Sequence, residues 1–296
     1  MKLWLDTSKT YAIALEGGGA KGAYEVGVWR ALDEADVRFD AVAGTSVGAL
    51  NGAMMVMGEL EQALRLWENI RFSQVFDADD EQLKKLYDHK LSEVDFRTLF
   101  KDAIEAIHEG GLDIEPLRRL IAEWVDEEKI RSSPKKLFLV TYSLTDKREL
   151  DMDADELEEG KLRDMLLASA YVPLFQRKKL DGKDYVDGSV HNIVPISSLL
   201  ERGYRDIIVI RIFGVGFEKR TRIPKDANII TVAPRERLGG VLQFAGIFRR
   251  TAEGVWSGRG EILHRQAMER NRGVFCVAGA VQTFYKGRNT FSAGAE

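Results

Sequence analysis

One serine of this chain stands in a pattern that is typical of catalytic nucleophiles. The segment Gly44-Thr45-Ser46-Val47-Gly48 fits G-x-S-x-G and lies between two apolar runs, the first short and the second longer. Such a strand–turn–helix context holds a serine hydroxyl at the apex of a sharp turn, where only very small residues fit two positions before and after it. The pattern predicts Ser46 as a nucleophile at a helix N-terminus, although a serine that only caps the helix fits the same sequence.

A glycine-rich segment, Gly17 to Gly22, follows an earlier apolar run. Gly17, Gly19 and Gly22 fit the dinucleotide fingerprint G-x-G-x-x-G, and Asp40 lies about 20 residues on, where a ribose-binding acid is expected. Consecutive glycines before a helix also direct several N–H groups to one point, which stabilises an anion such as the oxyanion of an acyl intermediate. A tight turn without chemistry is the third interpretation, and the segment alone does not decide among them.

A serine nucleophile needs a base, and the chain offers two kinds of candidate. There are four histidines, of which His191 and His264 follow Ser46 in an order that would suit a base, but neither stands in a recognisable motif. The other candidate is Asp187, which ends the short apolar run Tyr185-Val186 and precedes Gly188. Asp181 also precedes a glycine, but its flanks are typical of a hairpin, so we interpret it as a turn residue.

The elements that must position these residues alternate between strands and helices. Apolar runs at 11–15 and 39–43 predict buried strands, and helical spacing at 24–35 and 47–57 predicts a helix after each of them. Further helices are expected at 60–70, 96–107, 117–124 and 161–170, and further strands at 137–140, 207–210 and 229–232. The acidic segment 151–159 is interpreted as a solvated loop or exposed helix start. This alternation predicts an α/β fold with a mainly parallel central sheet flanked by helices.

Composition limits the partners and the location that we expect. The net charge of −4 gives no indication of nucleic acid as a partner. The single cysteine, Cys276, lies in an apolar run and is interpreted as a buried structural thiol. Residues 1–6 lack the long apolar core of a secretion signal, so we expect a cytoplasmic protein with at most peripheral membrane contact. Residues 238–250 could supply that contact as an amphipathic segment, but a packed helix is favoured.

Taken together, the motifs resemble those of the patatin-like phospholipase family, in the same order along the chain. The resemblance covers residues 11–213 and includes Ala168 to Phe175, Asn192 and Pro195. It implies a three-layer patatin-like fold and hydrolysis of a lipid ester by Ser46, with Asp187 as the proton acceptor and with no metal or cofactor. It assigns the oxyanion hole to Gly17, Gly18 and Gly19. The residues that it implies as support for the motifs are Lys21, Gly22, Gly44, Gly48, Gly188 and Ser189.

Two features depart from the family pattern. Ser189 replaces the small apolar residue that is usual after Asp-Gly, and its hydroxyl could hydrogen-bond Asp187 and lower its basicity. Residues 214–296 match nothing in the family, and we expect them to pack on the same domain as an extension. Two other functions stay open at this point: a dinucleotide-binding module built on the glycine segment, and a non-catalytic lipid-binding relative. The oligomeric state is open too.

Overall fold

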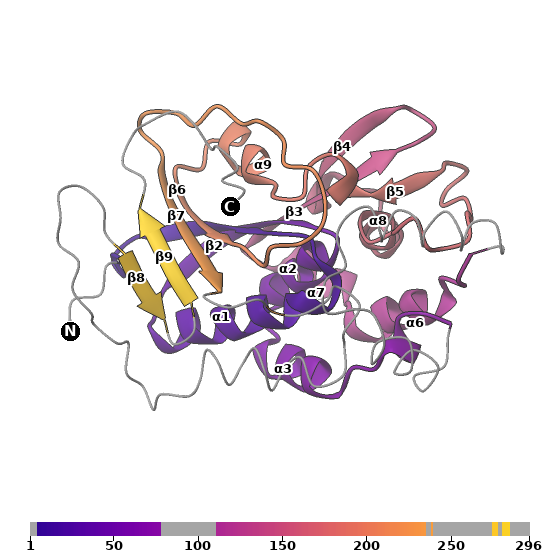
Figure 1. Cartoon of the computed structure of the whole chain (residues 1–296), viewed down its shortest axis with the longest axis horizontal. Helices are drawn as coiled ribbons and strands as arrows, with labels where there is room; N and C mark the ends of the chain where they lie inside the picture. The colour runs from indigo at the N-terminus through magenta and orange to yellow at the C-terminus, as the bar shows by residue number, and fades with distance from the viewer. Residues whose placement is uncertain (1–4, 78–110, 235–237, 239–273, 278–279, 285–296) are drawn as a thin grey trace.

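The computed structural model of the chain describes residues 5–77, 111–234, 238, 274–277 and 280–284 (Figure 1). The helix expected at 96–107, nearly all of the segment 238–250 and three of the histidines therefore lie outside the described residues. None of the described helices has the length and apolar character that a membrane span requires.

A single mixed sheet runs through the described part of the chain. Its strands follow the order β4-β3-β2-β1-β6-β7-β9-β8, and β5 pairs with β3 beside this path. The five consecutive strands from β3 to β7 are parallel to one another, whereas β4, β5, β9 and β8 pair antiparallel. The strands are β1 (Thr10–Leu15), β2 (Arg38–Thr45), β3 (Lys136–Ser143), β4 (Arg148–Asp153), β5 (Tyr185–Asp187), β6 (Asp206–Ile210), β7 (Asn228–Pro234), β8 (Val274–Val277) and β9 (Ala280–Phe284).

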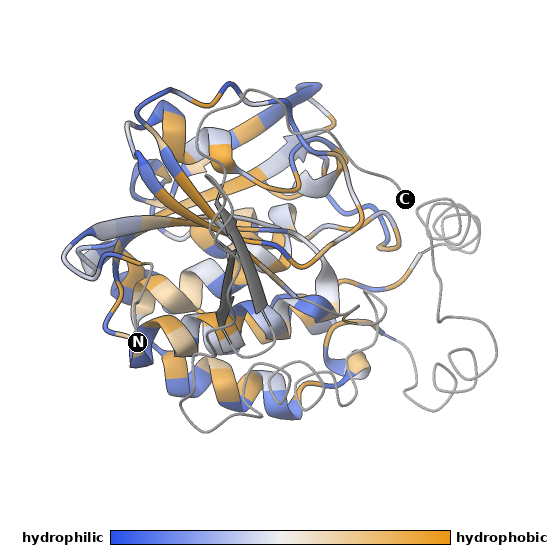
Figure 2. Ribbon diagram, turned by 60° about the vertical axis from the view of Figure 1, so that its left-hand side comes forward, coloured by the Kyte–Doolittle hydropathy of each residue, from blue (hydrophilic) through white to orange (hydrophobic). Residues whose placement is uncertain are grey.

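Helices cover both faces of the sheet, which gives three layers (Figure 1). The α-helices are α1 (Ala23–Glu34), α2 (Val47–Met57), α3 (Leu60–Asn69), α6 (Glu115–Trp124), α7 (Glu127–Ser132), α8 (Leu162–Ser169) and α9 (Ile196–Glu201). Short 3₁₀ helices are η1 (Gly19–Gly22), η2 (Phe72–Gln74), η3 (Ala154–Glu156) and η4 (Gly188–Val190). Apolar and polar positions alternate along the outer helices, as the hydropathy colours show (Figure 2).

The two faces of the sheet differ because successive strand residues point to opposite sides. In β1, Ile13 and Leu15 belong to the large core under α1, α2 and α3, while Ala12 and Ala14 belong to the smaller core under α9. The alanines on the second face allow α9 to lie close to the sheet. The strand–helix alternation and the mainly parallel sheet that the sequence predicts are confirmed.

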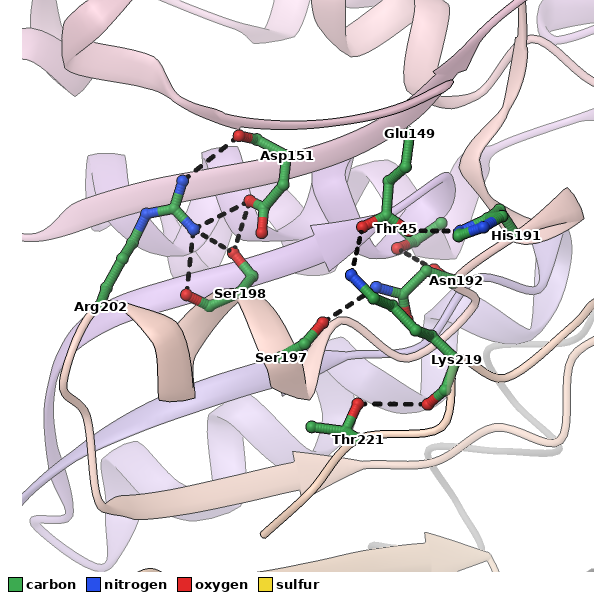
Figure 3. Close-up of polar contacts among 10 residues, drawn as sticks. All are labelled: Thr45, Glu149, Asp151, His191, Asn192, Ser197, Ser198, Arg202, Lys219 and Thr221. Atoms are coloured by element: carbon green, nitrogen blue, oxygen red, sulfur yellow. Dashed lines mark hydrogen bonds and ion pairs between the residues drawn. The ribbon is translucent and has the colours of Figure 1, made fainter. Parts of the chain in front are cut away.

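The acidic segment 151–159 is where the prediction of the local structure was wrong. Residues 151–153 belong to β4, and only 154–156 form a short helical turn. The Asp151 carboxylate enters the sheet because Arg202, which follows α9, and Ser198 of α9 donate to it, at 3.0 and 2.7 Å (Figure 3). These partners offset part of the cost of burying the carboxylate, although burial still raises the pKa of Asp151. The turn at Asp181 and Gly182 is confirmed: both have positive φ, and Leu180 and Lys183 bridge across it.

Candidate active site

Ser46 lies at the sharp turn between β2 and α2, in a strained backbone conformation. Its φ and ψ are 57° and −127°, a region that side-chain-bearing residues seldom occupy. A Cβ on Gly44 would lie 2.2 Å from the carbonyl oxygen of Gly48, and one on Gly48 would lie 2.7 Å from that of Leu15. Only glycine fits at either position, so the spacing of the motif follows from close backbone contacts at the turn.

A hydroxyl from another helix holds the amide of Ser46. The backbone N–H of Ser46 donates to Oγ of Ser169, at 2.9 Å, and that hydroxyl donates to the carbonyl oxygen of Val140 in β3, at 2.6 Å. Ser169 ends α8 and is fully buried. The sequence contained it only as part of the family-like segment 168–175, and nothing in its local pattern indicated this contact.

Asp187 approaches Ser46 because β2 and β5 pair with the same side of β3, one after the other along it. Thr45, the last residue of β2, pairs with Val140, and Asp187, the last residue of β5, pairs with the next residue, Thr141. The two strands run in opposite senses and so end at the same point. The fold thus brings together the serine and the carboxylate that the sequence singled out.

The carboxylate of Asp187 is buried and only partly bonded. Its exposed fraction is 3%, and Oδ1 accepts the N–H of Ser189 at 2.8 Å. Burial raises the pKa of Asp187, and hydrogen bonding from Ser46 and Ser189 lowers it to a smaller extent. Oδ2 has no partner of good hydrogen-bond geometry within the described structure, so the contact with the Ser46 hydroxyl is looser than a regular hydrogen bond. Such contacts commonly tighten when a substrate binds.

The glycine segment lies beside the side chains of Ser46 and Ser189. A Cβ on Gly17 would lie 2.5 Å from Oγ of Ser189 and 3.3 Å from Cβ of Ser46. The N–H of Gly17 donates to the carbonyl of Ile193, at 3.0 Å, so the assignment of this amide to the oxyanion hole was wrong. Gly18 and Gly19 line the same pocket as Ser46, and in the described part of the chain their N–H groups have no acceptor. They remain the candidate oxyanion donors.

A buried glutamate, Glu16, ties this segment to the loop after β6. Its carboxylate accepts the backbone N–H groups of Ile212, Phe213 and Gly214, at 2.6 to 3.3 Å, and pairs with Arg211 at 3.0 Å. Its exposed fraction is 1%. Lys21 strengthens the same connection, because its ammonium group donates to the carbonyl of Phe213. The sequence predicted a supporting role for the lysine but missed the glutamate, since its partners lie almost 200 residues away.

A deep apolar pocket of about 360 Å³ opens at Ser46. Its polar end holds Ser46, Asp187, Ser189, Gly18 and Gly19. Away from these residues it runs between α2, α3 and α6, and its lining there includes Leu50, Met54, Leu66, Trp67, Ile121 and Trp124. Ser46 and Met54 are two helical turns apart along α2, about 12 Å at the rise of an α-helix. The pocket therefore has the length and lining that suit an extended hydrocarbon chain.

A buried polar network underlies the wall of this pocket. Asn51 of α2 donates to Glu25 Oε2 at 2.7 Å and to the carbonyl of Gly22 at 3.0 Å, and it accepts from Trp67 Nε1 at 2.9 Å. The network thus connects the helix of the glycine segment, the helix of Ser46 and α3. Glu25 is fully buried, and burial raises its pKa well above the ordinary value.

Two alternatives from the sequence, His191 and Asp40, have other surroundings, and a third, His264, lies outside the described residues. His191 pairs with Glu149, at 2.6 Å (Figure 3). Its ring also lies against that of Tyr142. In the described part of the chain its polar partner is Glu149, and it forms no hydrogen bond with Ser46. Asp40 lies near the start of β2, whereas the glycine segment follows the end of β1. Because β1 and β2 are parallel neighbours, the two lie at opposite ends of these strands. The interpretation of Asp40 as a ribose-binding acid was wrong.

Comparison with known proteins shows which family this chain resembles. The family model described as patatin-like phospholipase matches residues 13–200, well over half of the chain. A segment covering 16% of the chain is 50% identical over 48 residues to the human patatin-like phospholipase domain-containing protein 6, and a similar one is 48% identical over 46 residues to lysophospholipase nte1 of Aspergillus terreus. The aligned segments span only 4% and 3% of the lengths of those two relatives.

Among solved structures, VipD from Legionella pneumophila aligns with 68% of this chain and 49% of its own, at 16% identity and a TM-score of 0.43. That likeness is weak, and the assignment rests on the family model. With that match over residues 13–200, this chain belongs to the patatin-like phospholipase family.

Proposed function

We propose that this protein is a serine acyl hydrolase that cleaves carboxylic-ester bonds of lipids through Ser46 and Asp187. The observation that carries the proposal is the position of a strained serine beside a buried carboxylate, at the polar end of a long apolar pocket. Family membership supports the same activity.

In the first half of the reaction, the Ser46 oxygen attacks the ester carbonyl while its proton passes to Asp187. The N–H groups of Gly18 and Gly19 stabilise the oxyanion of the tetrahedral intermediate, a contribution of about 3 kcal/mol per donor in comparable sites. Collapse of the intermediate breaks the ester C–O bond. The departing alcohol oxygen takes the proton back from Asp187, and the acyl group stays on Ser46.

In the second half, water attacks the acyl-enzyme and gives its proton to Asp187. The second intermediate expels the Ser46 oxygen, which recovers that proton, and the carboxylic acid leaves. One carboxylate thus serves as base and then as acid in each half. Its burial suits this role, because a raised pKa makes the Asp187 carboxylate a stronger base than an exposed aspartate.

The proposed substrate class follows from the shape and lining of the pocket. An apolar channel next to Gly18 and Gly19 fits the acyl chain of a fatty ester, with the scissile carbonyl at the polar end. Phospholipids, lysophospholipids and neutral lipid esters share that chemistry. We also propose that the protein acts in the cytoplasm, where it would reach such lipids from the membrane surface.

Labelling with a fluorophosphonate probe tests the nucleophile. We expect the parent protein to be labelled and to hydrolyse a long-chain p-nitrophenyl ester, and we expect Ser46→Ala to lose both properties while it keeps its thermal midpoint. Ser189→Ala is the matched control, because this serine lines the same pocket, and it should stay labelled. Labelling that survives in Ser46→Ala would refute the proposal. Fatty-acid binding without any turnover in the parent protein would instead support a non-catalytic lipid-binding relative.

A further inference from the structure

Three large apolar side chains are exposed in the described part of the chain, and they lie in or next to the segments that line the pocket. They are Val190, Phe213 and Phe217, with exposed fractions of 36%, 55% and 57%. Val190 and Phe217 line the pocket itself. The backbone of Phe217 is fixed there by two hydrogen bonds of 2.8 Å, one to Ser189 and one from Ile193. Exposed apolar groups that gather at one place commonly mark an interaction site.

Phe213 is exposed at a cost to the fold. Its φ of 50° lies in the left-handed region, which glycine and asparagine tolerate much better than a bulky side chain. Among the five non-glycine residues with positive φ in the described ranges, it is the only apolar one. The hydrogen bonds from its N–H to Glu16 and from Lys21 to its carbonyl hold this conformation. Folding alone gives no reason for an exposed aromatic ring here, so the strain points to a function.

Residues 213–220 of the loop that carries Phe213 and Phe217 have two cations, Lys219 and Arg220, against one acid, Glu218, although the whole chain carries −4. Arg220 is exposed, and Lys219 lies on the same loop at 34% exposure. Lys219 pairs with Glu149 at 2.9 Å, and the acid of the loop, Glu218, pairs with Arg211 at 3.1 Å (Figure 3 shows the former pair). Glu149 and Glu218 therefore each have a cationic partner, whereas Arg220 has no acidic partner among the residues that the structure describes. Apolar side chains with adjacent cations match the surface of an anionic bilayer.

We propose that Val190, Phe213, Phe217, Lys219 and Arg220 form a docking surface for an anionic phospholipid bilayer. The apolar side chains enter the interface, and the cations contact the lipid phosphates. The mouth of the pocket then faces the lipid, so that an acyl chain passes into it without crossing water. This inference rests on the proposed lipid substrate, and it places membrane contact on the loop after β6, which the sequence did not indicate.

Co-sedimentation with vesicles tests the docking surface in a Ser46→Ala background, where no lipid is consumed. Vesicles of phosphatidylcholine alone are compared with vesicles that also contain phosphatidylglycerol. We expect binding to the anionic vesicles that weakens as salt is raised, because the cations contribute through the surface potential. Arg220→Glu should weaken it by about tenfold, as expected for reversing one charge at the surface. Phe213→Asn should weaken it by about fivefold while the thermal midpoint is kept or raised, since asparagine suits the backbone.

Two matched variants complete the test. Lys225→Glu changes the net charge as Arg220→Glu does. Lys225 lies just before the start of β7, whereas the docking loop follows the end of the parallel strand β6, so this variant should bind as the parent does. Phe213→Leu keeps an apolar side chain with the same backbone strain and should also bind. Equal loss of binding in Lys225→Glu and Arg220→Glu would overturn the proposal. So would full binding by Phe213→Asn, and a change in that variant from dimer to monomer by light scattering would then assign the surface to a second copy of this chain.

Failure of the docking surface and failure of the proposed function give different results. Arg220→Glu with Ser46 intact should hydrolyse a soluble short-chain ester at the parent rate. If vesicle binding is insensitive to all of these variants while Ser46→Ala abolishes ester hydrolysis, the docking surface is wrong and the hydrolase stands. If the parent lacks ester hydrolysis, the proposed function fails whatever the vesicles show.

Discussion

Thr45 and Asp187 occupy consecutive positions along one edge of β3, where they pair with Val140 and Thr141. The candidate nucleophile directly follows the first of these residues, and the candidate base is the second. Ser46 and Asp187 are distant in sequence, and the pairing of β2 and β5 with the same strand, β3, brings their side chains together. The geometry of the site is thus a property of the sheet.

The first prediction concerns the base. Asp187→Asn keeps an oxygen that accepts the N–H of Ser189 but cannot take a proton, so we expect kcat to fall by about a thousandfold while the fold is retained. Single-turnover assays with a p-nitrophenyl ester measure the loss. His191→Ala is the control and should keep most of the activity. The assignment fails if the asparagine variant is fully active and the alanine variant is not.

The second prediction concerns the pH profile. Asp187 must be ionised to act as a base, and burial raises its pKa, so activity should fall with decreasing pH already above the range of an ordinary aspartate. The Ser189 hydroxyl lowers this pKa. Ser189→Ala should therefore move the acid limb of kcat/KM to higher pH without removing activity. Ser197→Ala, whose hydroxyl bonds Asn192 instead, should leave the limb in place; an unshifted limb in the Ser189 variant would count against the role of that hydroxyl.

The third prediction concerns Glu16. Replacing it with glutamine leaves the half-buried Arg211 with only Glu218 as an acidic partner and weakens the bonds to three backbone N–H groups. We expect a loss of about 2–4 kcal/mol in the free energy of unfolding, together with a lower kcat from a less ordered glycine segment. Urea titration measures the first effect. Glu218→Gln, which breaks a more exposed pair with the same arginine, should cost less than about 1 kcal/mol.

A fourth prediction concerns acyl-chain length. Leu50 and Met54 line the pocket one and two helical turns from Ser46, about 6 and 12 Å along α2. A tryptophan at Leu50 should restrict the protein to short acyl esters, and one at Met54 should exclude only longer chains, each at a stability cost of about 1–3 kcal/mol. A series of p-nitrophenyl esters of increasing length gives both cut-offs. Identical profiles for the two variants would show that the acyl chain does not run along α2.

The fifth prediction concerns Glu25 and stability. Its pKa is raised in the folded protein, so its contribution to stability is fully present below the pKa of the unfolded chain and is lost as pH rises through the folded pKa. Glu25→Gln keeps an acceptor for Asn51 without a charge, so its stability relative to the parent should increase as pH rises from acidic to alkaline. Urea titrations across pH measure this. Glu34→Gln, at the exposed end of the same helix, should show no such trend.

Much of the fold could be predicted because the residue pattern within each segment indicates which helix or strand it forms. The runs at 11–15 and 207–210 are apolar throughout, and the run at 39–43 is apolar except for Asp40, which is typical of strands buried on both faces; they form β1, β6 and β2. The turn at Ser46 was predictable for the same reason, since the small residues on either side are a local steric requirement. That residues 214–296 form an extension of the same domain stays a prediction. Within them, β7 pairs with β6 and continues the sheet.

The polar connections around the site could not be predicted, because each joins residues distant in sequence. Glu16 bonds a loop that follows the sixth strand, Ser169 reaches the amide of Ser46 from α8, and Gly17 gives its N–H to Ile193. Asp151 was misplaced for the same reason: its charge is offset by Arg202, which only the folded sheet brings near. Sequence patterns record what a residue does within its own element, and these contacts lie between elements.

The short strand β5 has a consequence for how the chain tolerates change. Only three residues of this strand pair with β3, and Asp187 is the last of them. Since neighbouring strand residues face opposite sides, sliding β5 by a single position would turn the carboxylate away and offer Val186 to the serine instead. Backbone bonds from Leu144 and Thr145 to the carbonyl of Asp184, and from Asp187 to that of Tyr171, hold the strand in this alignment. Insertion of one residue within β5 should therefore remove the proposed base from Ser46 while the rest of the sheet stays intact.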